Sequence, residues 1–222
     1  MQSIKNVESL PNAHTLKAIC KAISVLDAIL SPEWEFRYYS YNSHWDDNEE
    51  CMHMRNGQGD EMHVLFTSEG VVINGFAHQC IQPPKDELTT GLPPAFSEFI
   101  FGEPVQSIGT TFLLWKTGPE PWYKATNEHC DNSAEMLQIL DGKPQIYLEW
   151  ATEYFEGSYT EKGLPLSTVT QIYNGATLTN EMVLSISNSI ENWQQLIADM
   201  DEIGYPHTLS NPGKKSSWQF WK

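Results

Sequence analysis

Two histidines, His53 and His63, are the residues of this sequence whose types and spacing suggest chemistry most directly. A loop over residues 57–59 pairs Arg55 with Glu61 between the two flanking strands. The same register places His53 opposite His63, where two imidazoles can hold a metal ion or share a proton. Because Glu61 then pairs with Arg55, the sequence offers no third ligand. We therefore expect no metal site and interpret the pair as part of a solvated polar face.

An acidic run beside two tryptophans is a second candidate site. The formal net charge is −16, with 29 acidic residues against 13 lysines and arginines. Such a chain attracts a basic partner, and an aromatic side chain beside carboxylates can receive Lys or Arg from it. The glycine-containing loop that follows is explained by turn chemistry, but it can also serve as a contact point. The residues predicted to bind a protein partner are Trp34, Trp45, Asp46, Asp47, Glu49, Glu50, Arg55 and Asp60.

Several other kinds of function find no support in the sequence. The few lysines and arginines are spread along the chain, which disfavours nucleic-acid binding. No GxSxG motif or phosphate-binding glycine motif is present, and Glu149 and Glu153 are interpreted as solvated glutamates of a strand. We therefore expect no catalytic residue and no cofactor. Single, scattered cysteines predict reduced thiols in a core, and these are Cys20, Cys51, Cys80 and Cys130.

The hydropathy pattern bears on localisation. No apolar run reaches the length needed to cross a bilayer, and the first residues lack the apolar segment of a secretory signal. We expect a cytoplasmic protein that binds no membrane.

The elements that position the candidate residues begin with a helix. Asn12 is its predicted cap, apolar residues recur at helical spacing, and Ser31 and Pro32 end it. An alternating aromatic strand is predicted over residues 33–42. A three-stranded meander follows, and its apolar face needs a cover that the N-terminal helix can supply. That face consists of Met52, Met54, Met62, Val64, Phe66, Val71 and Ile73.

The remainder of the chain is predicted to be mixed and then helical. Residues 145–156 alternate between apolar and polar types, which predicts a strand. A final helix is predicted to be capped by Ser189 and ended by Gly204. The other predictions are a short helix at 95–104, a strand at 110–117, a long connection at 118–132, helices at 132–142, 166–173 and 181–186, and a tail that docks through Trp218, Phe220 and Trp221.

This order of elements predicts an α+β fold with an antiparallel β-meander sheet, an N-terminal helix packed on the sheet and a helical C-terminal part. We expect a single domain over residues 1–222, with a possible sub-boundary near residues 157–165, before the helical part.

The motifs MRNGQGD, HVLF and EGVVINGFAHQ together resemble the MRNGxGD…GFxH signature of an uncharacterised family of bacterial proteins that has no assigned activity. The resemblance covers about residues 33–79. It implies a bacterial origin and a small α+β fold, and it assigns no catalytic residue. The sequence departs from the signature at Gln79, where an acidic residue is expected.

These observations lead to two functional hypotheses of different classes. The first is a non-enzymatic cytosolic protein that binds a basic protein partner, in its most specific form an immunity protein that neutralises a basic toxin. The alternative is a small-molecule or metal-dependent enzyme or sensor that uses His53 and His63.

Overall fold

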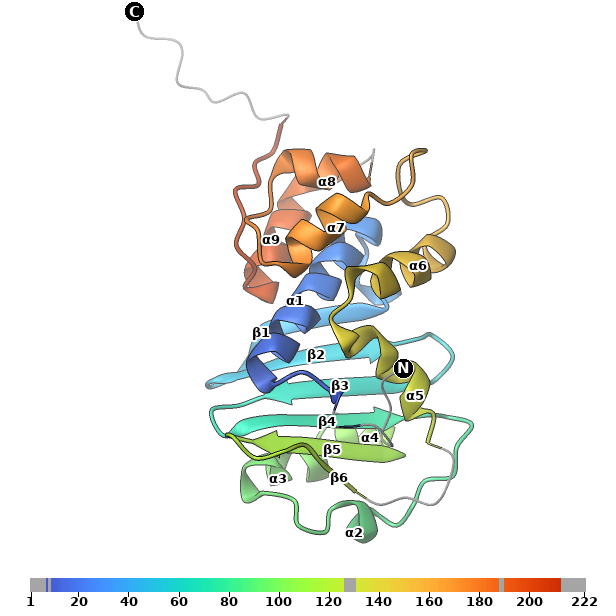
Figure 1. Cartoon of the computed structure of the whole chain (residues 1–222), viewed down its shortest axis with the longest axis vertical. Helices are drawn as coiled ribbons and strands as arrows, with labels where there is room; N and C mark the ends of the chain where they lie inside the picture. The colour runs from blue at the N-terminus through green and yellow to red at the C-terminus, as the bar shows by residue number, and fades with distance from the viewer. Residues whose placement is uncertain (1–6, 8, 126–130, 188–189, 213–222) are drawn as a thin grey trace, which may run out of the picture.

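The computed structural model describes residues 7, 9–125, 131–187 and 190–212. It shows an α+β fold with an N-terminal helix, a six-stranded antiparallel meander and C-terminal helices, as predicted (Figure 1). Cys130, Ser189 and the tail aromatics Trp218, Phe220 and Trp221 lie outside the described residues.

The sheet is a meander in which each strand pairs antiparallel with the next along the chain. Its cross-strand pairs confirm the predicted register, because His53 faces His63 and Arg55 faces Glu61. On the next strand, Asn74 faces His63. The strands are β1 (Tyr39–Asp46), β2 (Glu49–Arg55), β3 (Glu61–Phe66), β4 (Gly70–Phe76), β5 (Phe112–Thr117) and β6 (Tyr123–Lys124).

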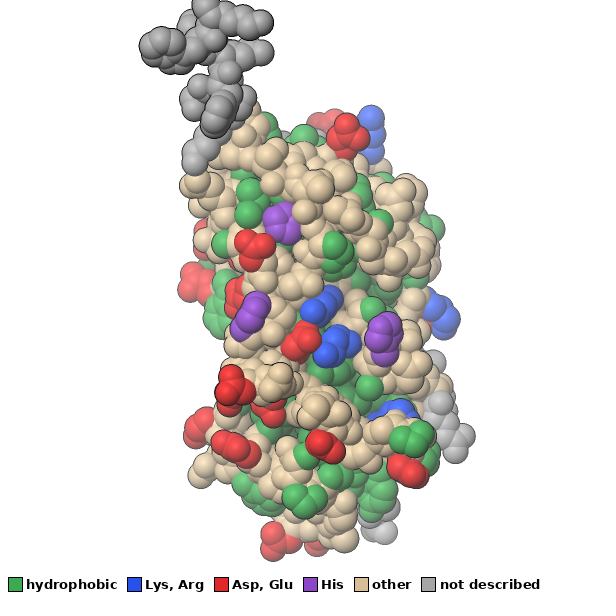
Figure 2. Space-filling view, turned by 90° about the vertical axis from the view of Figure 1, so that its left-hand side faces the viewer, with side chains coloured by type: hydrophobic (Ala, Val, Ile, Leu, Met, Phe, Trp, Pro, Cys, Tyr) green, Lys and Arg blue, Asp and Glu red, His purple; other side chains and the backbone are tan. Residues whose placement is uncertain are grey.

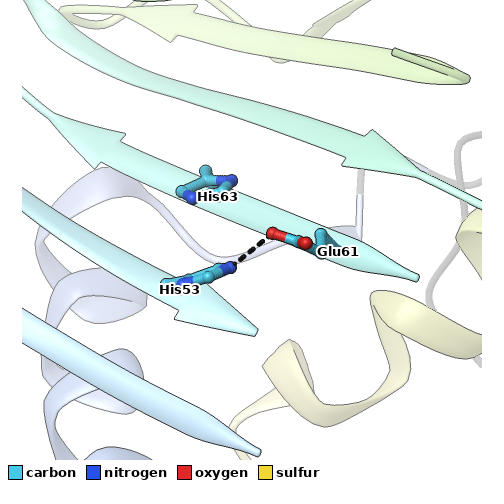
Figure 3. A group of neighbouring side chains, drawn as sticks. All are labelled: His53, Glu61 and His63. Carbon is cyan, nitrogen blue, oxygen red and sulfur yellow. Dashed lines mark hydrogen bonds and ion pairs between the residues drawn. The ribbon is translucent and has the colours of Figure 1, made fainter. Parts of the chain in front are cut away.

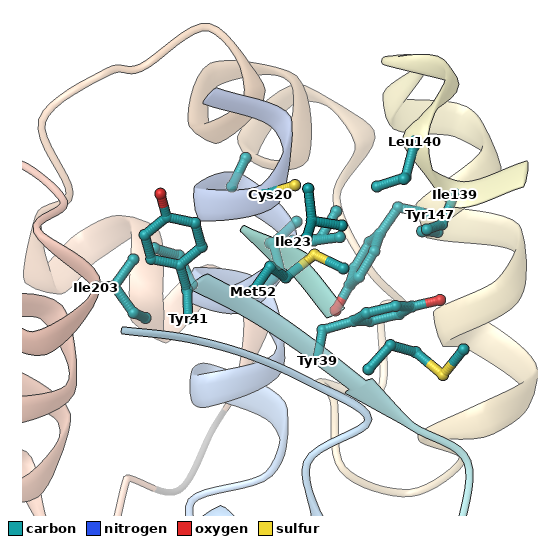
Figure 4. Packing of buried hydrophobic residues seen from close by; sticks show 14 of the residues in the cluster. Cys20, Ile23, Tyr39, Tyr41, Met52, Ile139, Leu140, Tyr147 and Ile203 are labelled. Carbon is teal, nitrogen blue, oxygen red and sulfur yellow. The ribbon is translucent and has the colours of Figure 1, made fainter. Parts of the chain in front are cut away.

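Helix α1 (Ala13–Leu30) covers the methionine-rich face of the sheet, as predicted. Asn12 Oδ1 accepts a hydrogen bond from the backbone N–H of Thr15 at 3.0 Å and so caps the first turn. Figure 4 shows Cys20 and Ile23 of this helix packed with Met52 and Tyr39. The last nine residues of α1, from Ala22 to Leu30, are all buried. A helix with no solvated face must be covered on more than one side.

The second cover of α1 comes from the C-terminal helices. Helices α7 and α9 pack against α1, and α9 also contacts the edge strand β1 (Figure 1). One hydrophobic cluster therefore runs from Val7 to Leu209. The helices of this layer are α5 (Ser133–Met136), η4 (Gln138–Asp141), α6 (Pro144–Tyr154), α7 (Leu166–Tyr173), α8 (Asn180–Ile186) and α9 (Trp193–Ile203).

The opposite face of the sheet is covered as well. Leu65, Val72 and Leu113 on this face pack against Phe96 and Ile100 in a second hydrophobic cluster. The prediction of a solvated polar face around His53 and His63 is therefore wrong, because a segment predicted to be mostly loop folds over it. Its helices are α2 (Lys85–Leu88), η3 (Pro94–Phe96), α3 (Ser97–Phe101) and α4 (Val105–Ile108).

Residues 145–156 form most of helix α6 and not the predicted strand. Pro144 occupies the start of the helix, where its missing N–H costs nothing. Tyr147 and Ala151, one turn apart, are the buried residues of the helix. The alternation of apolar residues predicts a strand, but Pro144 and the four-residue spacing of Tyr147 and Ala151 indicate the helix that forms.

Other boundaries also differ from the predictions. The first strand begins at Tyr39, and residues 34–36 form the 3-10 helix η2 (Trp34–Phe36) instead of a strand. The two-residue strand β6 lies in a segment predicted to be a connection. Helix α9 begins at Trp193 and is capped by Asn192, whose Oδ1 accepts from Gln195 N at 3.1 Å, while Gly204 ends it as predicted.

Asp27 joins α1, β1 and α6 inside the core. Its carboxylate accepts hydrogen bonds from the backbone N–H groups of Tyr39 at 2.8 Å and Tyr38 at 3.1 Å, and from the Tyr147 hydroxyl at 2.8 Å. Burial raises the pKa of Asp27 to about 7, although these hydrogen bonds and nearby Arg37 act to lower it. The start of β1 is thereby fixed relative to α6.

No described helix combines the length and apolar character that a bilayer span requires.

Candidate functional site

The loop between β2 and β3 is held by a network centred on Asp60. Asn56 Nδ2 donates to Asp60 Oδ2 at 2.9 Å, and Asn56 Oδ1 accepts from Gln58 N at 2.8 Å. Asp60 Oδ1 accepts from the backbone N–H of His78 at 2.9 Å and lies 2.7 Å from His78 Nδ1. Gly59 has a φ of +106°, and a Cβ there would lie 3.3 Å from His78 Cβ. Asn56 and His78, from the two ends of the MRNGxGD…GFxH signature, therefore both bond the Asp60 carboxylate.

A pocket of about 310 Å³ opens beside this network, and its wall is aromatic. Trp150 of α6 meets Tyr38 edge-on with ring centroids 4.9 Å apart, and it stacks on Tyr154 at 5.1 Å. Tyr39 lies 4.8 Å from Tyr38 and completes the wall. The lining residues are Tyr38, Tyr39, Met54, Asp60, Asn132, Glu135, Met136, Gln138, Ile139, Ile146, Glu149, Trp150 and Glu153.

Four carboxylates line the same pocket. Asp60 comes from the β2–β3 loop and Glu135 from α5, while Glu149 and Glu153 lie four residues apart on α6 and so share one side of that helix. Gln145 Nε2 donates to Glu149 at 3.0 Å. None of the described lining residues is Lys or Arg. The pocket is thus an aromatic cavity with concentrated negative charge.

A second hollow of about 370 Å³ adjoins the first, since the two share Asp60, Asn132 and Glu135. We call the two together the acidic aromatic groove. The second part is lined by the loop network, including Asn56, Gln58 and His78. The groove therefore runs from the rings of Tyr38 and Trp150 to the loop whose residues carry the sequence signature.

Burial, and next the neighbouring carboxylate of Glu135, raises the pKa of Tyr38 to about 12. The Tyr38 hydroxyl is therefore protonated at neutral pH, and it presents a neutral aromatic group to any ligand in the groove.

The acidic run forms the turn between β1 and β2. Asp46 pairs with Glu49, Asn48 adopts a left-handed φ of 61°, and Asp46 and Asp47 are exposed. Burial, followed by the nearby charge of Asp46, raises the pKa of Glu49. Figure 2 shows the acidic side chains of one face spread out among other types and not gathered in one patch.

Glu50 points inward and is not part of an open acidic surface. Its carboxylate lies 2.9 Å from Lys17 Nζ and 2.8 Å from Lys21 Nζ, and accepts from the Tyr41 hydroxyl at 2.8 Å. Partial burial acts to raise the pKa of Glu50, but the hydrogen bonds from Lys21, Lys17 and Tyr41 lower it to about 2.

The residues predicted to bind a partner fall at two ends of β2. Trp45, Asp46, Asp47 and Glu49 lie at its start, whereas Trp34, Arg55 and Asp60 lie near its end. Six residue steps along a strand separate the two ends by about 20 Å. Asp60 is the predicted residue that lines the acidic aromatic groove.

Arg55 does not pair with Glu61, although the two residues face each other in the sheet. The guanidinium of Arg55 lies 3.7 Å from the ring centroid of Trp34, and Arg55 donates to the backbone carbonyls of Trp34 and Arg37. The predicted ion pair is wrong because η2 offers Arg55 an aromatic face together with two carbonyl acceptors. Glu61 is left free to reach a different partner.

Glu61 instead bonds His53, which creates a cluster of three residues whose side chains can bind a metal ion. Glu61 Oε2 lies 2.8 Å from His53 Nε2, and the rings of His53 and His63 stack with centroids 4.1 Å apart and an interplanar angle of 14°. Figure 3 shows the three side chains on adjoining strands β2 and β3. One ligand atom from each residue lies within 4.8 Å of the others.

His63 is the buried member of this cluster, with only 2% of its surface exposed. Its ring packs against Phe99 at 6.1 Å, and its Nδ1 has no hydrogen-bond partner among the described residues. Burial, and next the neighbouring His53, lowers the pKa of His63 to about 3. The imidazole is therefore neutral at physiological pH.

The thiols of Cys20 and Cys51 are not expected to react. Cys20 and Cys51 are buried, and burial raises the pKa of each thiol. A thiol that stays protonated is a poor nucleophile, which agrees with the prediction that these cysteines fill the core.

Sequence reasoning missed the groove and the third member of the histidine cluster. The sequence assigned Glu149 and Glu153 to a strand, where residues four apart share a face but lie about 13 Å apart. Helix α6 instead places them one turn apart, at about 5–6 Å. The signal for Glu61 was its position two residues before His63, which puts both side chains on one face of a strand.

Comparisons with known proteins find no family model that matches the chain, and no similar curated protein or solved structure. The resemblance of the loop signature therefore stays an expectation.

Proposed function

We propose that this protein binds a basic protein partner by receiving a Lys or Arg side chain in the acidic aromatic groove. The observation that carries this proposal is a pocket walled by Tyr38 and Trp150 and lined by four carboxylates, with no Lys or Arg among its described lining residues.

The pocket suits an organic cation for two physical reasons. A cation over the face of Trp or Tyr gains about 0.5–2 kcal/mol, more as water is excluded. Carboxylates such as Glu135 and Glu149 supply Coulomb attraction and hydrogen-bond acceptors for an ammonium or guanidinium group. A volume of about 310 Å³ accommodates one side chain with its aliphatic stem.

The adjoining hollow extends the contact beyond one side chain. Asn56, Gln58 and His78 offer polar groups along this second part of the groove. Backbone groups of a bound segment can pair with them, which would add orientation to charge attraction.

The acidic turn between β1 and β2 has a separate role in this proposal. Asp46 and Asp47 lie at the far end of β2 from the groove, so they contribute to the negative field that accelerates encounter with a basic partner. In its most specific form, the proposal is a cytoplasmic, non-enzymatic immunity protein that neutralises a basic toxin.

The test compares two double variants that remove the same charge. Glu149→Gln with Glu153→Gln changes the groove, and Asp46→Asn with Asp47→Asn changes the distant turn. A lysine-rich peptide is titrated into each protein by calorimetry at low salt. We expect the groove variant to bind about tenfold more weakly, since two charge contacts contribute about 1.4 kcal/mol together. The turn variant should lose less than about threefold, mainly through slower association.

Equal losses in the two variants would show that the peptide follows net charge alone, and the groove proposal would then be wrong. The neutral variant Trp150→Leu supplies a further check because it changes no charge. It should also weaken binding, provided that its circular dichroism matches the parent protein.

The partner itself can be sought by capture from the native host at low salt and elution at high salt. A basic protein that is retained by the parent and the turn variant, but not by the groove variant, would be the expected partner.

A further inference from the structure

The cluster of His53, Glu61 and His63 lies on the opposite face of the sheet from the groove. Its three side chains come from paired positions on β2 and β3, where the backbone ladder fixes their spacing. Metal sites require this kind of placement, since ligands on regular elements are held more precisely than ligands on loops.

The buried nitrogen of His63 is the observation that points to a ligand. A buried polar atom without a partner costs about 1–3 kcal/mol, so such atoms are rare. Neighbouring Asn74 does not serve it, because the Asn74 side chain accepts from Thr110 Oγ1 at 2.7 Å and donates to the Gly109 carbonyl at 3.1 Å. His63 thus has hydrogen-bonding capacity that the described residues leave unused.

The donor set has a clear chemical preference. Two imidazole nitrogens and one carboxylate oxygen suit Zn²⁺ and its neighbours in the transition series, whereas Ca²⁺ and Mg²⁺ favour oxygen donors alone. Three protein ligands leave one position of a tetrahedral ion for water or for an added ligand.

Binding requires a local rearrangement. An ion lies in the plane of each imidazole that binds it, so the parallel rings of His53 and His63 must tilt out of their stack. His53 and Glu61 can move, since 22% and 30% of their side chains are exposed. The same exposure gives an ion a path to buried His63.

We propose that His53, Glu61 and His63 bind one Zn²⁺ ion, with the fourth coordination position open to solvent. The histidines were the sequence-derived candidates, and the structure adds Glu61 as the third ligand.

Calorimetric titration of Zn²⁺ into untagged, chelator-treated protein tests this proposal. We expect one ion per chain. Glu61→Gln and His53→Ala should each weaken binding at least about 100-fold, because even residues that only orient a metal ligand contribute about 10- to 100-fold. His44→Ala is the matched control, since His44 is an exposed imidazole on β1 outside the cluster.

Replacing Zn²⁺ by Co²⁺ gives a spectroscopic measurement of coordination. Residues with a purely structural role would not change this spectrum. A tetrahedral site with two imidazoles and a carboxylate should give intense visible absorption in the parent and in His44→Ala, and lose it in Glu61→Gln. Zn²⁺ should also raise the thermal midpoint of the parent protein but not that of Glu61→Gln.

Zn²⁺ affinity that is unchanged in both cluster variants would overturn the proposal, and so would the absence of stoichiometric binding to the parent. The groove variant Glu149→Gln with Glu153→Gln should bind Zn²⁺ normally. Failure of the peptide-binding proposal and failure of the metal proposal are therefore distinguishable.

Discussion

Glu50 shows that acidic residues close together in the sequence need not form one acidic surface. Four acidic residues stand close together in the sequence, yet the chain turns Glu50 toward Lys17, Lys21 and Tyr41. Its carboxylate therefore ties α1 to the start of β2, and the two lysines of α1 balance its charge.

Replacing Glu50 by Gln should lower the free energy of unfolding by about 1 kcal/mol at pH 7, the size expected for a partly exposed charge cluster. The folded pKa of about 2 lies below the ordinary value of 4.5. This contribution is therefore complete above pH 4.5 and is lost as the pH falls through 2. Urea unfolding of both proteins between pH 2.5 and 7 measures the difference.

The neighbouring variant Glu49→Gln is the control. Its pKa is raised in the folded protein, so loss of its charge should not destabilise. A deficit that grows toward low pH, or equal deficits in the two variants, would contradict this account of Glu50.

The two histidines mark the limit of sequence reasoning for single residues. Their cross-strand pairing was predictable, because matching apolar and charged residues across the loop selects one register. The conformation of a long, flexible side chain could not be predicted in the same way. Arg55 and Glu61 face each other as predicted, but a nearby aromatic ring and two carbonyls compete for Arg55.

At the scale of elements, the sheet was the more predictable part. Its alternation has a period of two residues, and a slip by one residue would expose the methionine-rich face. Helix α6 was predicted to be a strand, because Ile146, Leu148 and Trp150 alternate with other residues in the sequence. In the helix these three residues are only partly buried, so their spacing does not mark its buried face. The misassigned helix carries Glu149 and Glu153, so an error in one element hid the groove.

Tyr147 connects α6 to the core through its hydrogen bond to Asp27. The variant Tyr147→Phe keeps the ring but removes one of the three donors to a buried carboxylate. We expect a loss of about 1–3 kcal/mol in the free energy of unfolding. Chemical denaturation at pH 8, above the raised pKa of Asp27, measures the effect where the carboxylate is charged.

Tyr154→Phe on the same helix is the matched substitution. The ring of Tyr154 is 45% exposed, so its loss of a hydroxyl should change stability by no more than about 0.5 kcal/mol. Similar losses in both variants would argue against the role given to the bond between Tyr147 and Asp27.

At the scale of the whole molecule, α1 lies between the sheet and the C-terminal helices. The core cluster contains residues from both sides of the possible sub-boundary at residues 157–165. Buried Arg37, just before β1, also reaches Asp199 of α9 with a distance of 2.6 Å between Nη2 and Oδ2. Breaking such a buried pair costs about 3–5 kcal/mol.

We therefore expect residues 1–163 alone not to fold cooperatively. Removal of α7, α8 and α9 uncovers one side of α1 and removes Asp199, the ion-pair partner of Arg37. Urea unfolding of the fragment should be broad, and the fragment should bind a hydrophobic dye that the full chain does not. A sharp transition in either residues 1–163 or residues 164–222 would show that the chain contains separable domains.

The position of α1 has a consequence for the synthesis of the chain. Helix α1 is made before α9, which closes its second side and lies more than 160 residues later in the chain. At about 5–20 residues per second, roughly ten seconds or more of translation separate the two events. During that interval the segment from Ala22 to Leu30 has no complete cover. We therefore expect the growing chain to expose this apolar segment until α9 has been made and can pack against it.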